Sequence, residues 1–131
     1  MLDYKLKSYP KEIERRRSVA ARYQLGLGDL EELNLPPGPN ADSRHFDVYQ
    51  NYELEADRRD ELRAYLDQHG IKTIIQWAGT PVHQFKELGF TDNLPKTDAF
   101  FFRCLMLPMN SAVTDDEVDY IVKAMRNFYG K

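Results

Sequence analysis

The side chains best suited to chemistry gather in one short stretch, residues 76–83, which reads QWAGTPVH. His83 could exchange a proton near neutral pH, whereas the amide of Gln76 can only form hydrogen bonds. The indole of Trp77 offers a flat aromatic surface. Turns that follow strands often carry function, although a lone histidine is more often structural. The stretch is therefore a candidate binding site, and these residue types alone do not identify its ligand.

The other reactive side chains form no catalytic or metal-binding pattern. His45 and His69 lie far from His83 in the sequence, and the single cysteine adds no cluster. His69 is expected in the last turn of a helix, where a cation is favoured, so its role is interpreted as structural. Cys104 stands among apolar residues and is expected to be a small buried hydrophobe. The glycines are isolated, and no phosphate-binding loop is visible.

Composition predicts an ordinary globular domain covering residues 1–131. The chain is 42% hydrophobic and 30% charged, with a net charge of −3. This charge argues against binding to nucleic acids or anionic membranes, and no apolar run approaches the ~18 residues of a spanning helix. One cysteine allows no intrachain disulfide, so a cytoplasmic location is expected. The Arg15–Arg17 run has glutamates interleaved before it, which favours a solvated helix face over a phosphate patch.

Four elements are expected up to the candidate site. They are two helices and two strands, and the second strand runs into the site. Residues 10–27 follow a helical period, with Pro10 at a first helical position and glycines at the end. Three prolines and a glycine make residues 34–44 a loop. The expected elements that follow are a period-2 strand over 46–54, a helix over 62–69 and a β-branched strand over 71–77.

The remaining elements close the fold. A short helix is expected over 81–88 and another over 96–103, and a strand over 105–109 is interrupted by Pro108, which indicates an edge or a strand end. Thr114 and Glu117 form a capping box for the last helix. Its buried face is predicted to consist of Val118, Ile121, Val122, Met125 and Phe128. The order predicts a small α/β or α+β layer, in which helices cover one face of a three-stranded sheet.

Five segments, in order and with family-like spacing, resemble the C-terminal small domain of the DegT/DnrJ/StrS family of pyridoxal-phosphate-dependent sugar aminotransferases. Residues 2–27 are similar to the family helix between the two domains, in which a basic cluster precedes Ala-x-x-Tyr. The segments VYQNYEL, RRDELRAYLDQHGIKT, QWAGTPVHQF and LMLPMNSAVTDDEVDYIV are similar to the family's strand, helix, active-site turn and ending. Each segment alone is a weak match, but the five segments in this order are specific for the family.

The resemblance implies the small domain of a fold type I aminotransferase, with a small, mostly antiparallel sheet, and residues 1–28 as an interdomain helix region. In that family the large domain holds the lysine that forms a Schiff base with pyridoxal phosphate. None of the lysines in this chain matches that position, because the corresponding region is absent. The resemblance therefore implies no cofactor and no catalytic residue in this chain alone, and pyridoxal phosphate in the parent enzyme.

The resemblance also suggests substrate-binding positions. His83 retains a family histidine, Gln76 and Gln50 stand where many members have histidine, and Trp77 replaces a tyrosine. Gln76 cannot titrate near neutral pH, so only its hydrogen bonding remains. Pro10 is a further departure, which is expected to kink or restart the interdomain helix.

Two functions follow as expectations. In the first, the chain completes the substrate cleft of an aminotransferase acting on a nucleotide-linked keto-sugar and does not transaminate alone. In the second, it is a non-catalytic interaction module that pairs with itself or with a separate catalytic half; a start close to a domain boundary and the lost histidines favour this. Exposed apolar side chains at Leu2, Leu6 and Phe100–Phe102 are expected to drive self-association. A nucleic-acid binder is disfavoured by the charge.

Overall fold

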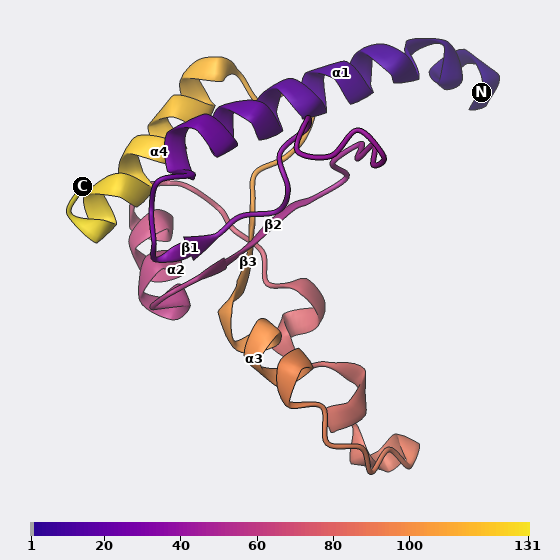
Figure 1. The fold of residues 1–131 in the computed structure, drawn as a ribbon, viewed down its shortest axis with the longest axis vertical. Coiled ribbons are helices and arrows are strands. Elements are labelled where there is room, and N and C mark those ends of the chain that lie inside the picture. Colours follow the sequence, from indigo (N-terminus) through magenta and orange to yellow (C-terminus); the bar gives the residue numbers. More distant parts are fainter. Residues whose placement is uncertain (1) are drawn as a thin grey trace.

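The computed structural model describes residues 2–131, and side chains from residue 6 onward. Four α-helices, three strands and three short 3₁₀ helices follow one another in this part of the chain (Figure 1). The α-helices are α1 (Leu2–Leu27), α2 (Arg59–Gln68), α3 (Pro95–Arg103) and α4 (Asp115–Tyr129), and the strands are β1 (Leu33–Asn34), β2 (Tyr52–Ala56) and β3 (Cys104–Leu107). The 3₁₀ helices are η1 (Gln76–Gly79), η2 (Val82–Gln84) and η3 (Lys86–Leu88).

The strands form one antiparallel sheet in the order β1-β2-β3. Tyr52 pairs with Leu107 and Leu54 with Leu105, so these four side chains share a face. Beyond β3, Ile74 adds a single antiparallel bridge to Met106. The predicted three-stranded sheet is confirmed, and so is the placement of β3 at an edge.

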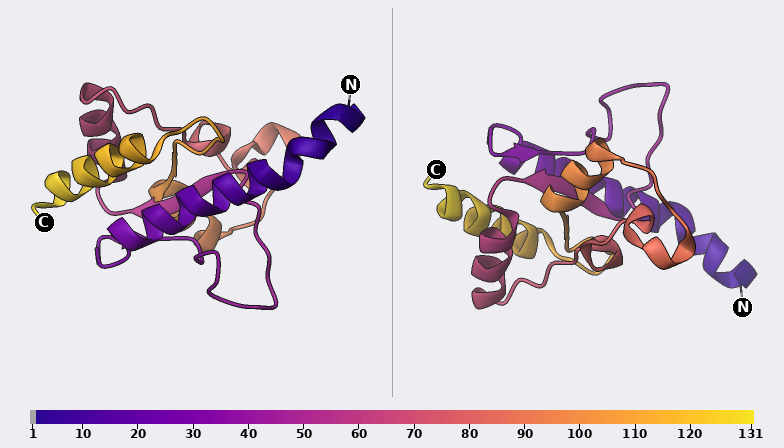
Figure 2. Two further views of the ribbon diagram at one scale, coloured as in Figure 1. Left: turned by 90° about the horizontal axis from the view of Figure 1, so that it is seen from above. Right: turned by 90° about the horizontal axis from the view of Figure 1, so that it is seen from below.

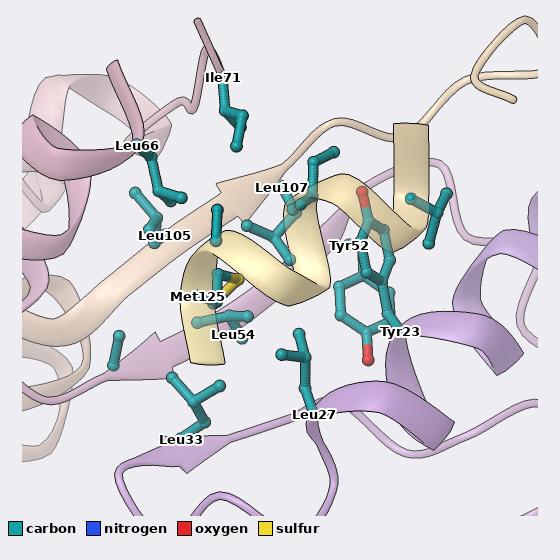
Figure 3. Packing of buried hydrophobic residues seen from close by; sticks show 14 of the residues in the cluster. Tyr23, Leu27, Leu33, Tyr52, Leu54, Leu66, Ile71, Leu105, Leu107 and Met125 are labelled. Atoms are coloured by element: carbon teal, nitrogen blue, oxygen red, sulfur yellow. The ribbon is translucent and has the colours of Figure 1, made fainter. Parts of the chain in front are cut away.

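Helices α1, α2 and α4 cover the face of the sheet that carries Tyr52, Leu54 and Ala56 (Figures 1 and 2). Tyr23 of α1 and Met125 of α4 are fully buried against these strand residues (Figure 3). Burial of large apolar side chains is the main favourable term for a domain of this size. The expected fold class, helices packed on one face of a small sheet, is therefore confirmed.

The other face of β2 carries Glu53 and Glu55, whose side chains are half-buried. The segment that contains η1, η2, η3 and α3 extends away from the helical layer (Figure 1). This arrangement places the candidate turn on the side of the sheet opposite to the main core.

The first helix is longer than the sequence pattern predicts. It begins at Leu2 and has Pro10 in its interior, so the expected start at Pro10 is wrong. A proline inside a helix removes its own N–H donor and crowds the carbonyl four residues earlier, although its φ is compatible with helical geometry. Leu6 and Tyr9 are exposed, so the turn before Pro10 is not packed in the core, and water can satisfy the carbonyl that proline leaves free. The end of the helix at Leu27 agrees with the prediction.

Two strand predictions are wrong in extent. Residues 46–51 are not a strand, since Tyr49 adopts a left-handed conformation (φ 49°), is buried, and breaks the alternation. Of residues 71–77, only Ile74 pairs with the sheet. The third strand of the sheet is instead the two-residue β1. It was not predicted, because it lies at the start of the expected loop over 34–44. Between 81 and 88 the chain forms two 3₁₀ turns rather than one helix, and Gly89 ends them at φ 84°.

The basic run on α1 is a set of structural anchors, so its interpretation as a solvated face is wrong. Arg15 donates to Asp115 at 2.6 Å, which joins α1 to the start of α4. Arg16 donates to the carbonyls of Tyr49 (3.1 Å) and Gln50 (2.9 Å). Arg17 donates to the carbonyls of residues 39 and 47 at 2.6 and 2.7 Å. Guanidinium groups carry several donors, and here they satisfy carbonyls of the loop before β2.

The capping box of α4 is confirmed. The backbone N–H of Glu117 donates to Thr114 Oγ1 at 3.2 Å, and the N–H of Thr114 donates to Glu117 Oε2 at 2.7 Å. The predicted apolar face packs on the core, with Val118, Ile121 and Met125 buried. Gly130, at φ 75°, ends the helix. Helix α2 also follows its prediction and ends before Gly70.

Candidate functional site

The turn after Ile74 has an unusual backbone. Trp77 and Ala78 both adopt left-handed conformations, with φ of 51° and 54°. Such conformations cost about 1 kcal/mol or more for residues other than glycine, so surrounding contacts must hold them. The N–H of Thr80 closes the turn on the Trp77 carbonyl at 3.1 Å. The turn presents the indole of Trp77 outward, with 76% of the residue exposed.

The amide of Gln76 joins this turn to the sheet. One terminal atom of this amide lies 3.2 Å from Glu53 Oε2 and the other lies 3.2 Å from Trp77 Nε1, and hydrogen-bond chemistry assigns the nitrogen to Glu53 and the oxygen to the indole. A carboxylate can only accept and an indole N–H can only donate, so the two partners determine which way the amide points. Gln76 is thus a bridge between β2 and the exposed indole.

Glu53 of β2 supplies the carboxyl group to which the Gln76 amide bonds. Burial raises the pKa of Glu53 above its usual range, and the neighbouring Cys104 thiol lowers that pKa in part. Glu53 Oε1 is buried without a hydrogen-bond partner. The position thus favours the neutral carboxyl more than an exposed glutamate does.

His83 lies behind the turn and is almost fully buried, with 5% exposed. Its Nε2 lies 2.9 Å from Asp98 Oδ1, and the Gln84 amide donates to the same oxygen at 2.7 Å. Since a carboxylate only accepts, Nε2 carries the proton of this hydrogen bond. Asp98 is in the first turn of α3, where the helix dipole favours negative charge.

A hollow of about 610 Å³ lies between the turn and α3. It is lined by Trp77, Thr80, Pro81, Val82, His83, Phe85, Leu94, Thr97 and Phe101. The wall is mostly apolar and aromatic, with two threonine hydroxyls and one histidine as its polar groups. Such a wall suits the flat face of a ring system and offers few hydrogen bonds to fix its orientation.

The structure brings three of the four predicted site residues together. Trp77 and His83 line the hollow, and Gln76 bonds to Trp77. Gln50 is exposed in the loop before β2, where its carbonyl accepts from Arg16, and it does not line the hollow. The substrate-binding role of all four stays a prediction.

Sequence reasoning missed two participants, Asp98 and Glu53. Asp98 carried one usable signal, since it is an acid in the first turn of an expected helix. Glu53 had no such signal in the sequence, because it is one of several polar residues that alternate with apolar ones in the expected strand. Their proximity to His83 and Gln76 comes from tertiary folding.

The remaining reactive groups have structural surroundings. Burial raises the pKa of the Cys104 thiol, and its Sγ donates to the Phe101 carbonyl at 3.6 Å. His69 Nδ1 lies 2.8 Å from the Tyr65 carbonyl. Within residues 2–131, no group of three or more His, Cys, Asp or Glu side chains is arranged to hold a metal ion. No helix in the described part of the chain is long and apolar enough to cross a membrane.

The residues present do not fit a covalent pyridoxal-phosphate site. Every lysine whose side chain is described is exposed, namely Lys7, Lys11, Lys72, Lys86, Lys96, Lys123 and Lys131. Lys72 pairs with Asp67, and Lys86 Nζ donates to the His83 carbonyl at 3.4 Å. An amine that forms a Schiff base near neutral pH needs a pKa lowered by burial or by a nearby cation.

Comparison with known proteins identifies the fold and its family. The chain superposes on Streptomyces venezuelae DesV with a TM-score of 0.89 and 27% identity, over 99% of this chain and 35% of that one. It superposes on the aminotransferase TlmJ from Streptoalloteichus hindustanus with a TM-score of 0.86 and 28% identity, over 95% and 34% of the two chains. The architecture is that of part of a fold type I aminotransferase. Residues 1–126 match the DegT/DnrJ/EryC1/StrS aminotransferase family, and the chain belongs to that family.

Sequence relatives have related names. The chain is 31% identical over 121 residues to a "pleiotropic regulatory protein" of Geobacillus stearothermophilus, covering 88% of this chain and 32% of the relative. It is 30% identical over 119 residues to a dTDP-3-amino-3,4,6-trideoxy-alpha-D-glucose transaminase of Streptomyces venezuelae, covering 87% and 30%. The chain therefore spans about a third of the length of these relatives.

Proposed function

We propose that residues 1–131 act as one small domain that completes the substrate cleft of a pyridoxal-phosphate-dependent sugar aminotransferase. The observation that carries the proposal is the aromatic hollow, with Trp77 and His83 in its wall, in a chain of this family. In this proposal α1 is the interdomain helix, and the cofactor is held by a lysine-bearing partner domain. The chain alone does not transaminate.

The proposed substrate is a nucleotide-linked sugar in the cytoplasm. Support comes from the relative named as a dTDP-sugar transaminase. The indole of Trp77 would stack on the base or the sugar ring, and Nδ1 of His83 would accept a hydrogen bond from a hydroxyl group. Gln76 would act mainly through its bond to the indole, and Gln50 would contact the substrate only after the loop before β2 moves.

Nucleotide binding tests this role directly, because Trp77 is the only tryptophan in the chain. Titration with dTDP and dTDP-glucose is expected to change the Trp77 emission to a saturating value. His83→Ala should weaken binding, and His45→Ala, an exposed histidine in the loop before β2, should leave it unchanged. Equal binding by the wild type and His83→Ala, or no binding by either, contradicts the role.

Absence of activity in the isolated chain has its own test. With pyridoxal phosphate and an amino donor, the chain is expected to show no saturable cofactor absorption band. A saturable band that one lysine substitution abolishes would contradict the proposal. Transamination that is restored by adding the lysine-bearing domain of a relative would support it.

The alternative role is an interaction module that pairs with itself or with a catalytic half. Exposed apolar side chains favour it: Val82 (60%), Leu88 (66%) and Phe102 (74%) lie along the extended segment, and Leu6 (55%) lies on α1. Phe100 is also exposed and Phe101 half-buried, while the side chain of Leu2 lies outside the described residues. Sedimentation of the chain decides the matter, since a strict monomer that recovers no partner contradicts this role.

A further inference from the structure

The orientation of Trp77 needs an explanation, because the residue is both strained and exposed. Its backbone is left-handed and the next residue, Ala78, is left-handed as well. With 76% of the residue exposed, the indole has little packing to hold it. A side chain in this situation samples several rotamers unless a polar contact selects one.

That polar contact runs from the indole to the sheet. With the Gln76 amide oriented as its two neighbours require, Trp77 Nε1 donates to the amide oxygen and the amide nitrogen donates to Glu53 Oε2, each at 3.2 Å. If Gln76 turned over, both bonds would be lost together, since its oxygen would face a carboxylate and its nitrogen would face an N–H group. The carboxyl of Glu53 thus determines the amide's direction, and the amide determines where the indole N–H points.

Glu53 is well placed to act as the fixed end of this chain. It lies within β2, paired with Met106 of β3, and so belongs to the most regular part of the fold. Its Oε1 is buried and lacks a hydrogen-bond partner, although the Cys104 thiol, a weak donor, is nearby. The bond from Gln76 is therefore the stronger restraint on the carboxyl.

We infer that Glu53 is a positioning residue that fixes the Trp77 indole at the edge of the hollow through the amide of Gln76. Its effect on a bound ligand rests on the proposed function, whereas its effect on the indole stands on the geometry alone.

The chain offers a matched control on the same strand and the same face. Glu55 lies two residues further along β2 and accepts from Asn34 Nδ2 at 2.7 Å. It is therefore directed toward β1, at the opposite edge of the sheet from the turn, which follows Ile74 beside β3. Removing either carboxylate changes the charge of the chain equally, and only the loss of Glu53 should affect Trp77.

Time-resolved fluorescence anisotropy of Trp77, excited selectively over tyrosine, tests the inference without a ligand. Glu53→Ala and Gln76→Ala should each increase the amplitude of fast local motion, and the double variant should add little to either. Glu53→Gln keeps an oxygen acceptor and should restore the wild-type amplitude, and Glu55→Ala should not change it. Wild-type anisotropy in Glu53→Ala, or an equal change in Glu55→Ala, overturns the inference.

Titration with dTDP then separates this inference from the proposed function. If the indole stacks on the nucleotide, Glu53→Ala should weaken dTDP binding by about 2- to 10-fold, the range expected for one net hydrogen bond. Glu53→Gln should bind like the wild type. If the wild type fails to bind dTDP, the proposed function fails, and the anisotropy result alone decides the role of Glu53. Strong binding that Glu53→Ala leaves unchanged would contradict the positioning role at the ligand.

Discussion

The Nε2 atom of His83 lies 2.9 Å from Oδ1 of Asp98, and this pair joins the 3₁₀ segment to the first turn of α3. Gln84 donates to the same carboxylate oxygen at 2.7 Å, so two consecutive residues are held by one acid. His83 itself lines the hollow that Trp77 borders, and Asp98 holds it there. Its integrity should therefore control the local order of the candidate site.

Removal of Asp98 should loosen the segment more than it unfolds the domain. Asp98→Ala leaves the buried Nε2–H of His83 without an acceptor, which costs about 1–3 kcal/mol. Because the segment lies outside the main core, we expect faster amide hydrogen exchange at 82–89 and little change in α4. Asp92→Ala, an exposed acid in the same segment, is the control. Unchanged exchange at 82–89 in Asp98→Ala would show that the pair does not hold the segment.

The pH dependence of stability should carry a contribution from Glu53. Burial raises its pKa in the folded state, so folding favours the neutral carboxyl. This contribution is fully present below the unfolded pKa, about 4.3, and is lost as the pH rises through the higher folded value. Thermal unfolding across this range should show Glu53→Gln gaining stability relative to the wild type as the pH increases. A constant difference between the two proteins would contradict the burial argument, and Glu55→Gln, on the same face of β2, is the comparison variant.

Loss of the capping box should destabilise α4. Thr114→Ala removes the acceptor for the Glu117 N–H, and such substitutions cost about 1 kcal/mol, within a range of about 0.5–2. The decrease should appear as a lower midpoint in urea with an unchanged slope. Ser111→Ala, an exposed hydroxyl just before the helix, should change the midpoint little. Equal effects from both variants would rule out a specific capping contribution.

Close contact between α1 and α4 makes Gly26 sensitive to substitution. A Cβ at this position would lie 2.6 Å from Cγ1 of Val122. Overpacking costs about 1–3 kcal/mol, and the higher helix propensity of alanine returns up to about 1 kcal/mol. Gly26→Ala should therefore be destabilising in a denaturant titration. Val122→Ala should relieve the clash, so the double variant should be more stable than the sum of the single effects predicts.

Elements with strong local signals could be predicted from the sequence. Helix α4 has a capping box, an apolar stripe and a terminal glycine, and all three signals agree on its limits. Helix α2 ends before Gly70 for the same kind of reason. In each case the signals lie within a few residues of one another, so no distant contact is needed to place the element.

Elements that depend on distant partners were the ones predicted poorly. The alternation from Phe46 to Leu54 resembles a strand, yet Arg16 holds the carbonyls of Tyr49 and Gln50 in a loop. Residues 71–77 have β-branched side chains, but only Ile74 reaches β3. Strand formation requires a partner in register, which intrinsic preference does not supply.

The candidate site divides in the same way. The sequence by itself pointed to Gln76, Trp77 and His83, because a polar and aromatic turn after an apolar run is a local pattern, and the ordered motifs indicated the family. Only the tertiary structure brought Asp98 to His83 and Glu53 to Gln76. The first pair is 15 residues apart in the sequence. The second pair is separated by the end of β2, by helix α2 and by the segment that leads to the turn. The reason is physical: side-chain types and their spacing set local conformation, whereas burial and hydrogen-bond partners arise when the sheet and helices pack together.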